Sequence, residues 1–160
     1  MNATLAKLLR NYGGIAPEAV QKQTRKLYEQ TYCNTPLATH DGKKVVFKPI
    51  RFHHAFFSSE QRRSIPGAKD DFQVSRAERI DWIREFVGAT IKGIECWEVP
   101  PECKGEGRQR LYVFWDPAYL VWLFDRSPDG FEFSTAYHSS TTYLRQKLKG
   151  ISAKKIWWRA

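Results

Sequence analysis

The stretch RQRLYVFWDPAYLVWLFDRSPDGFEFSTAY, residues 108–137, decides the fold class of this chain. It contains three runs rich in β-branched and aromatic residues, at 108–115, 118–125 and 130–137, and a fourth run, GIECWEV, precedes them at 93–99. The segments between the runs, PPECKGEG, DP and RSPDG, all contain proline or glycine, which is typical of turns between strands. Four consecutive strands with short connections predict a mostly antiparallel sheet.

The last run also predicts which side chains are buried. Alternate residues of a strand point to opposite faces, so one face is expected to be buried and the other polar. The two alternating sets are Phe131, Phe133 and Thr135 against Glu132, Ser134 and Ala136.

Helical patterns precede these strands. Residues 3–12 and 17–31 predict two helices, and Pro17 suits a first helical position. The clearest helix is SRAERIDWIREFVGATI, residues 75–91, in which Ser75 and Glu78 form a capping-box pattern. KVVFKPI, residues 44–50, predicts a first strand that lies at an edge or ends near Pro49, and residues 139–149 predict a final helix or turn.

This order of elements predicts an α+β fold in which N-terminal helices pack on a mostly antiparallel sheet of four to five strands. The length of 160 residues fits a single domain. Within it we distinguish a helical N-terminal extension at 1–40, a core at 43–148 and a basic tail at 149–160.

The composition narrows the cellular context. Hydrophobic residues make up 42% of the chain and charged residues 27%, and no apolar run approaches the ~20 residues that cross a bilayer. The N-terminus has no signal-peptide pattern, so we expect a cytoplasmic protein without membrane contact. The three cysteines, at 33, 96 and 103, have no CxxC spacing, so we expect no disulfide framework, no zinc site and no cofactor.

The formal net charge of +9 is the first indication of function. A surplus of lysine and arginine raises the local concentration of phosphate polyanions, and together with an aromatic content of 14% it favours nucleic-acid binding. A solvated basic tail is the simpler alternative, and an anionic membrane surface is a weaker one. After the last acidic residue, Glu132, the chain carries only basic charges: Arg145, Lys147, Lys149, Lys154, Lys155 and Arg159.

Two of the four histidines, His53 and His54, are adjacent within VVFKPIRFHHAFFSS, residues 45–59. If the strand extends this far, one imidazole can enter the core and the other faces the opposite side. Histidine transfers protons near neutral pH and arginine stabilises phosphate charge, which is the chemistry that RNA cleavage by its own 2′-hydroxyl needs. Arg76 and Arg79 in the predicted helix, and STAYHSS at 134–140, supply further groups of this kind.

Each of these groups also has a structural explanation. A histidine can pack beside the neighbouring phenylalanines, and Arg76 and Arg79 can pair with acidic residues on a solvated helix face. Thr135 and Tyr137 favour strands whatever their role.

Taken together, the elements resemble a known group. The pattern VVFKPIRFHHAF, a loop, SRAERIDWIREFV, a proline-bearing connection and strands ending in FEFSTAY is similar to the phage-associated branch of the barnase, EndoU, colicin and RelE-like (BECR) nuclease superfamily. The resemblance covers residues 43–148. It implies helices packed on a four-stranded antiparallel sheet, RNA bound across the open sheet face, and a metal-independent endoribonuclease, often a toxin or a mobile-element protein with an antitoxin or immunity partner.

The resemblance also implies roles for individual residues. His54 would be a general acid or base, although the doubled histidine leaves open which ring is catalytic, and the arginines would clamp phosphate. The candidate catalytic residues are His53, His54, Arg76, Arg79, Thr135 and Tyr137. Further candidates for RNA contact lie beside these elements and in the tail: Arg51, Arg62, Arg63, Ser134, His138, Arg145, Lys147, Lys149, Lys154 and Lys155.

Two other function classes fit the sequence. A non-catalytic RNA-binding module would stack bases on Trp115, Tyr119 or Trp122. An interaction protein would hold its partner through the helices predicted at 3–12 and 17–31. The RNA target, whether tRNA, messenger or ribosome-associated RNA, and the oligomeric state do not follow from the sequence.

Overall fold

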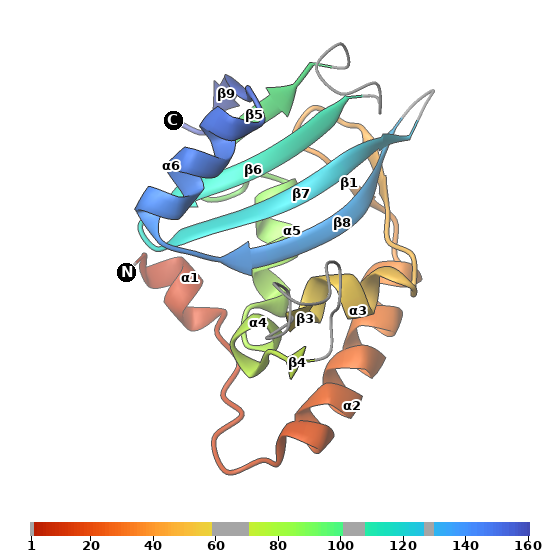
Figure 1. Ribbon diagram of the computed structural model, residues 1–160. Coiled ribbons are helices and arrows are strands. Elements are labelled where there is room, and N and C mark those ends of the chain that lie inside the picture. The colour runs from red at the N-terminus through yellow and green to blue at the C-terminus, as the bar shows by residue number, and fades with distance from the viewer. Residues whose placement is uncertain (1, 59–70, 101–107, 127–129) are drawn as a thin grey trace, which may run out of the picture.

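The computed structural model describes residues 2–58, 71–100, 108–126 and 130–160 and confirms an α+β fold (Figure 1). Over these residues the main sheet has seven strands, in the order β1-β2-β8-β7-β6-β5-β9. Every neighbouring pair is antiparallel except β2 and β8, which are parallel. The strands are β1 (Leu37–Ala38), β2 (Lys44–Val46), β5 (Glu95–Val99), β6 (Gln109–Trp115), β7 (Ala118–Arg126), β8 (Gly130–His138) and β9 (Lys154–Trp158).

The four predicted central strands, β5 to β8, are confirmed, but the prediction of four to five strands in total was wrong. The predicted basic tail contributes β9, which pairs with the edge of β5 and is held there by side chains as well as backbone. The ring of Trp157 stacks on His40 with centroids 3.9 Å apart. At the other edge β1 and β2 form a short hairpin, and β2 pairs with the first three residues of β8 only.

The two histidines lie on a helix that follows the first strand, so that strand does not extend as far as His53 and His54. Strand β2 ends at Val46, and α3 (Arg51–Phe56) begins after a turn in which the Phe52 N–H donates to the Pro49 carbonyl. The spacing in RFHHAF is helical, because Phe52, Ala55 and Phe56 form one buried face. A second, two-stranded sheet of β3 (Phe57–Ser58) and β4 (Asp71–Phe72) follows.

The helix predicted at 75–91 is divided in two. Helix α4 (Val74–Ala77) ends before Arg79, and α5 (Ile80–Val87) begins after it. The predicted capping box does not form: Ser75 lies inside α4, its hydroxyl is bonded to His138, and neither helix has a side-chain cap.

The remaining helices are α1 (Ala3–Lys7), α2 (Pro17–Tyr28), which continues as a π-helical turn, η1 (Glu29–Cys33), and α6 (Thr141–Gly150). The first is shorter than predicted. The prediction of a helix or turn at 139–149 is met by α6, in which the Ser140 side chain accepts a hydrogen bond from the Tyr143 N–H.

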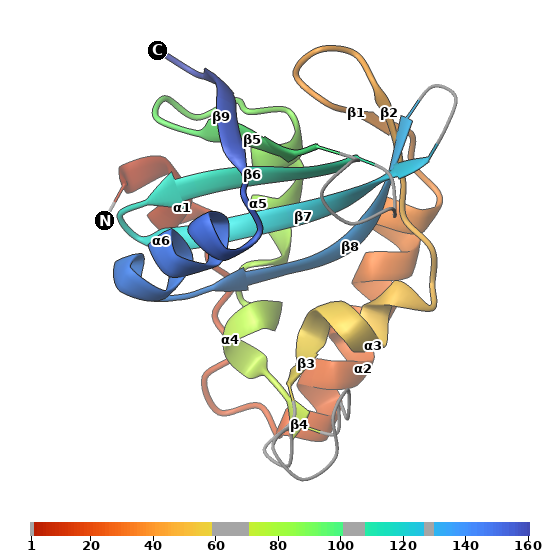
Figure 2. The ribbon, with the colours of Figure 1, turned by 45° about the horizontal axis from the view of Figure 1, so that its top comes forward.

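Helices lie on both faces of the sheet (Figures 1 and 2), and a hydrophobic core forms on each face. The larger core joins α1, α2, α3 and α5 to one face and contains Tyr28, Phe86 and Phe133. The smaller core lies under α6, where Leu144 and Leu148 pack on the sheet. Because α6 covers only part of its face, β7 and β8 line a hollow beside it. No helix among the described residues is long and apolar enough to cross a membrane.

Candidate nucleic-acid site beside helix α6

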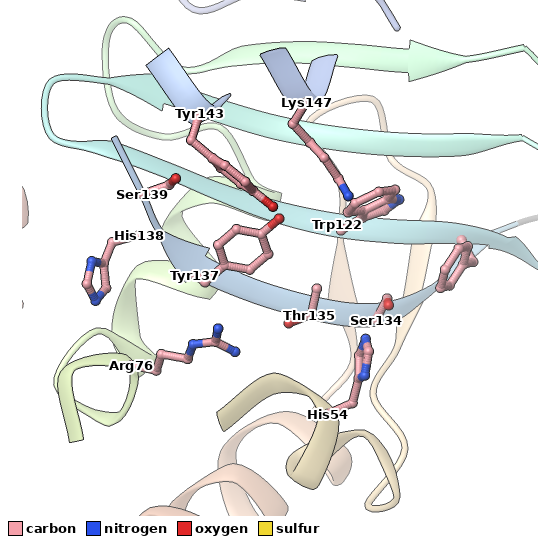
Figure 3. A pocket seen from close by; sticks show the side chains of 11 residues that line it. His54, Arg76, Trp122, Ser134, Thr135, Tyr137, His138, Ser139, Tyr143 and Lys147 are labelled. Atoms are coloured by element: carbon pink, nitrogen blue, oxygen red, sulfur yellow. The ribbon is translucent and has the colours of Figure 1, made fainter. Parts of the chain in front are cut away.

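A pocket of about 470 Å³ lies where β7, β8, α3, α4 and α6 meet (Figure 3). Three parts of the chain contribute to it: α3 at 51–56, α4 at 74–77, and the consecutive elements β7, β8 and α6, which lie between 118 and 150. The residues that line it are His54, Arg76, Trp122, Phe124, Ser134, Thr135, Tyr137, His138, Ser139, Tyr143 and Lys147.

A β-bulge in β8 brings Ser134 and Thr135 into the pocket together. Phe133 pairs with Leu123 and Thr135 pairs with Trp122, so Ser134 is the extra residue in β8. A bulge of this kind interrupts the alternation of faces. The prediction that Thr135 shares the buried face of Phe133 was therefore wrong, and Ala136 takes the core position instead.

Helix α3 supplies His54 and turns His53 away from the pocket. Successive residues of a helix lie about 100° apart, so the two imidazoles point in different directions. The half-buried His54 ring points toward β8, as Figure 3 shows. The exposed His53 ring stacks on Phe57, with centroids 4.0 Å apart, and does not line the pocket.

Helix α4 supplies Arg76, which joins α3 to the pocket wall. Its Nη1 donates to the carbonyl oxygens of Ala55 and Phe57, at 3.1 and 3.2 Å, at the end of α3. Its guanidinium carbon lies 5.2 Å from the ring centre of Tyr137, within range of a cation–π contact. Arg76 therefore fixes the position of the helix that carries His54.

Arg79 does not line the pocket, contrary to the prediction that it would join Arg76 there. It lies at the break between α4 and α5, where its Nη1 donates to the Ser75 carbonyl at 2.7 Å. Its guanidinium carbon lies 5.2 Å from the ring centre of Trp82. These contacts direct the side chain toward the helices.

Helix α6 supplies Tyr143 and Lys147, which are four residues apart and so lie on one flank of the helix. Lys147 Nζ lies 4.9 Å from the ring centre of Trp122. The Trp122 N–H donates to Gln109 Oε1 at 3.1 Å, and this bond fixes the plane of the indole. Figure 3 shows Tyr143 and Lys147 reaching from α6 toward Tyr137 and Trp122.

His138 lies at the end of β8, at the rim of the pocket. Its Nε2 is 3.0 Å from the Ser75 hydroxyl. Burial lowers the pKa of His138, and the nearby charges of Arg79 and Arg76 lower it further. The lowered pKa favours the neutral form of the imidazole.

The charge of the pocket is positive. The described lining residues include Arg76 and Lys147 and no acidic side chain. The adjacent carboxylate of Glu132 accepts ion pairs from Lys48 at 3.0 Å and Arg51 at 2.8 Å. Hydroxyls, imidazoles and cations around one hollow suit the binding of a phosphate group. Across the described ranges, no three His, Cys, Asp or Glu side chains gather where a metal ion could bind.

The other residues predicted to contact RNA are distributed around the molecule. Arg51 pairs with Glu132, and Lys155 lies 3.5 Å from Glu95 at the sheet edge. Lys154 is exposed on β9. Arg145 and Lys149 line a second pocket on the other flank of α6. Arg62 and Arg63 lie outside the described residues.

Sequence reasoning missed Phe124 and Tyr143 as pocket residues, and it named Ser139 only as part of STAYHSS. The spacing of Tyr143 and Lys147 was an available signal, because residues four apart share a helix flank. Phe124 lies two residues after Trp122 on β7, so the period of a strand would have placed both on one face. Tyr119, predicted as a stacking residue, is only 2% exposed and packs against Trp82 and Phe86.

Comparisons of the chain with protein families, with curated proteins and with solved structures found no match. The site is therefore interpreted from its own geometry.

Proposed function

We propose that this protein is a metal-independent endoribonuclease. The observation that carries the proposal is that one pocket gathers His54, Arg76, Thr135 and Tyr137 from three separate segments, with no acidic residue among its described lining. Four of the six candidate catalytic residues are thus neighbours in space. The resemblance to BECR nucleases, which rests on the same segments, supports the same function.

The residues of the pocket suit cleavage by the RNA's own 2′-hydroxyl. In that reaction the 2′-oxygen loses its proton and bonds to phosphorus, the bond from phosphorus to the 5′-oxygen breaks, and the departing 5′-oxygen gains a proton. The products are a 2′,3′-cyclic phosphate and a 5′-hydroxyl. His54 is assigned to proton transfer, because its imidazole points toward the pocket from α3.

The cations and hydroxyls are assigned to the phosphate. Negative charge gathers on the non-bridging oxygens as the new bond forms, and fixed cations stabilise it. Arg76 and Lys147 supply that charge from opposite sides of the hollow, one from α4 and one from α6. Thr135 and Tyr137 present hydroxyl groups between them.

The test is cleavage of RNA by the purified protein, with and without EDTA, followed by analysis of the product ends. We expect cleavage in EDTA with cyclic phosphate ends, and a loss of about 100-fold or more for His54→Ala, which is the usual contribution of a general acid or base. His53→Ala is the matched control, since its ring lies outside the pocket, and it should keep the wild-type rate. Intact RNA with the wild-type protein, or cleavage that EDTA abolishes, would refute the proposal.

A non-catalytic RNA-binding module is the second candidate, and one observation favours it. Trp122 and Phe124 line the same pocket, Lys147 lies over the Trp122 ring, and aromatic rings beside cations bind single strands without chemistry. In that case RNA would stay intact, the His54→Ala variant would bind as well as the wild type, and Trp122→Ala would bind more weakly.

The proposed partners are RNA and, by the resemblance to toxins, an antitoxin or immunity protein.

A further inference from the structure

A second pocket, of about 240 Å³, lies on the other flank of α6. It is hollowed between that helix and the strands β5 and β6, on the same face of the sheet as the first pocket. Its lining is two indoles, two cations and two aliphatic side chains: Trp97, Trp115, Arg145, Leu148, Lys149 and Ala153.

The two indoles are held in place by one carboxylate. The Trp97 and Trp115 N–H groups both donate to Oε1 of Glu95, at 2.9 and 2.8 Å. The other carboxylate oxygen, Oε2, lies 3.5 Å from Lys155 Nζ, which compensates the negative charge. Both ring planes are therefore fixed before any ligand arrives, which lowers the entropy that binding a planar group would cost.

Helix α6 presents the same combination of groups on both of its flanks. Residues four apart share a flank, so Tyr143 and Lys147 face the first pocket while Arg145 and Lys149 face the second. On each side a cation of α6 lies over a tryptophan of the sheet. Lys147 Nζ is 4.9 Å from the ring centre of Trp122, and the Arg145 guanidinium carbon is 5.9 Å from that of Trp115.

We propose that the second pocket is a nucleotide subsite, which stacks one unpaired base on the indoles while Arg145 and Lys149 hold the neighbouring phosphates. Fixed aromatic rings beside cations are the features that bind single-stranded nucleic acid, and the described lining of this pocket has no acidic residue. The base is expected to be unpaired, because a paired base would first have to leave its stack and its partner, which costs free energy that a single-stranded base does not have to provide.

The inference rests on the proposed function in one respect: the same RNA strand occupies the first pocket and passes over α6. It adds to that function a requirement for a strand long enough to reach both flanks. A short oligonucleotide fills the first pocket alone, and a longer one gains the second stack and the contacts of two further cations.

The experiment measures binding of 2′-O-methyl oligonucleotides, which lack the attacking hydroxyl, by fluorescence anisotropy. The series runs from a dinucleotide to an octanucleotide, with the wild-type protein, the double variant Arg145→Gln/Lys149→Gln, and the control Lys22→Gln/Lys26→Gln. The control removes two exposed lysines with the same spacing from α2, which packs on the other face of the sheet. The substituted side chains of both variants are exposed, and the folding of the variants is first compared with that of the wild type by circular dichroism.

We expect the affinity of the wild type and of the control to rise by about tenfold at the length that fills the second pocket, which is the usual contribution of one stacked base. The double variant should lose that step and keep its affinity for the shortest oligonucleotides. A plot of log affinity against log salt concentration should have a slope smaller in magnitude by about 1.4 for the double variant, because two phosphate contacts on a single strand are lost.

An abasic residue moved along the longest oligonucleotide tests the stacking itself. Wild-type affinity should fall by about tenfold at the position that reaches the second pocket, and Trp115→Leu should abolish that position's effect. Equal losses in the double variant and the control, or no abasic position that depends on Trp115, would overturn the inference and leave the surface to some other partner. Because these ligands cannot be cleaved, the subsite can fail while RNA cleavage stands, and it can hold while RNA cleavage fails.

Discussion

Replacement of the buried Arg110 by methionine should destabilise the protein more than the same replacement of the more exposed Arg108. Arg110 lies on β6 and is only 2% exposed, yet it carries a full charge. Its guanidinium donates to both carboxylate oxygens of Asp41, at 2.7 and 3.0 Å, and to Glu98 at 2.8 and 2.9 Å. It therefore ties the turn between β1 and β2 to the centre of the sheet.

The expected loss of stability follows from what the substitution leaves behind. Removal of one partner of a buried ion pair costs roughly 3–5 kcal/mol, because the remaining charge is stranded. The side chain of Asp41 is 37% exposed and can recover water, whereas that of Glu98 is 18% exposed. Methionine keeps much of the packing beside Phe131. We therefore expect a loss of about 3 kcal/mol, which for a chain of this size lowers Tm by about 6–12 °C.

The assay is urea unfolding of the wild type and of the single variants Arg110→Met and Asp41→Asn, together with the double variant. The double-mutant cycle should give a coupling free energy between 110 and 41 of about 1–3 kcal/mol. Arg108→Met is the matched control, because the side chain of Arg108 is 36% exposed and lies 3.7 to 3.8 Å from its acidic neighbours; it should cost about 1 kcal/mol or less. Equal losses for Arg110→Met and Arg108→Met would refute the reasoning.

Three further predictions concern the sheet edge, the pocket and pH. Gly130→Ala should cost about 1–3 kcal/mol in urea unfolding, because a Cβ there would lie 2.3 Å from the Lys44 carbonyl oxygen and separate β2 from β8; an unchanged midpoint would contradict the pairing. Arg76→Lys keeps the charge but loses the planar guanidinium, whose Nη1 holds the end of α3 while its plane lies beside Tyr137, so RNA cleavage should fall by about tenfold or more, and a wild-type rate would exclude the positioning role. Burial lowers the pKa values of His40 and His138 below their values in the unfolded chain, so the unfolded state binds more protons as pH passes through about 6.5. The free energy of unfolding should therefore fall as pH drops from 7 to 5, and His40→Gln should reduce this fall. Equal pH slopes in the wild type and the variant would contradict the role of His40.

The central strands were predictable because their information is local. Each of β5 to β8 has a run of β-branched and aromatic residues between proline or glycine signals, and such runs specify strands without knowledge of their partners. Strand β9 was not predictable in this way. Its sequence, KKIWW, begins with two lysines. It forms a strand because it pairs with the edge of β5 and because the Trp157 ring stacks on His40.

The bulge in β8 is a second feature that could not be predicted from local sequence. Local alternation places Thr135 on the face of Phe133, but the pairing with β7 inserts one residue and reverses the faces from that point. A register shift is a property of two strands, so the sequence of one strand does not contain it. The pocket nevertheless depends on it, since Ser134 and Thr135 line the pocket together because of that extra residue.

The prediction of the candidate site was incomplete for a similar reason. The sequence predicted Arg76 and Arg79 on one continuous helix, where residues three apart share a face. The break between α4 and α5 separates them, so that Arg76 lines the pocket and Arg79 packs against Trp82. His53 and His54 were assigned to opposite faces of a strand, and they also point in different directions on the helix, although for a different geometric reason.

The two helices that carry His54 and Arg76 are too short to be stable alone. Isolated helices below about 12 residues are marginal in water, and α3 and α4 have six and four residues. Their positions are fixed by tertiary contacts: Phe52 packs on Tyr28, and Arg76 donates to carbonyl oxygens at the end of α3. Arg76, which we assign to the phosphate, therefore also positions the helix that carries His54. Changes in the core below α3 should then reach the chemistry of the pocket before they unfold the sheet, because backbone hydrogen bonds join β6, β7 and β8 to one another and do not involve either helix.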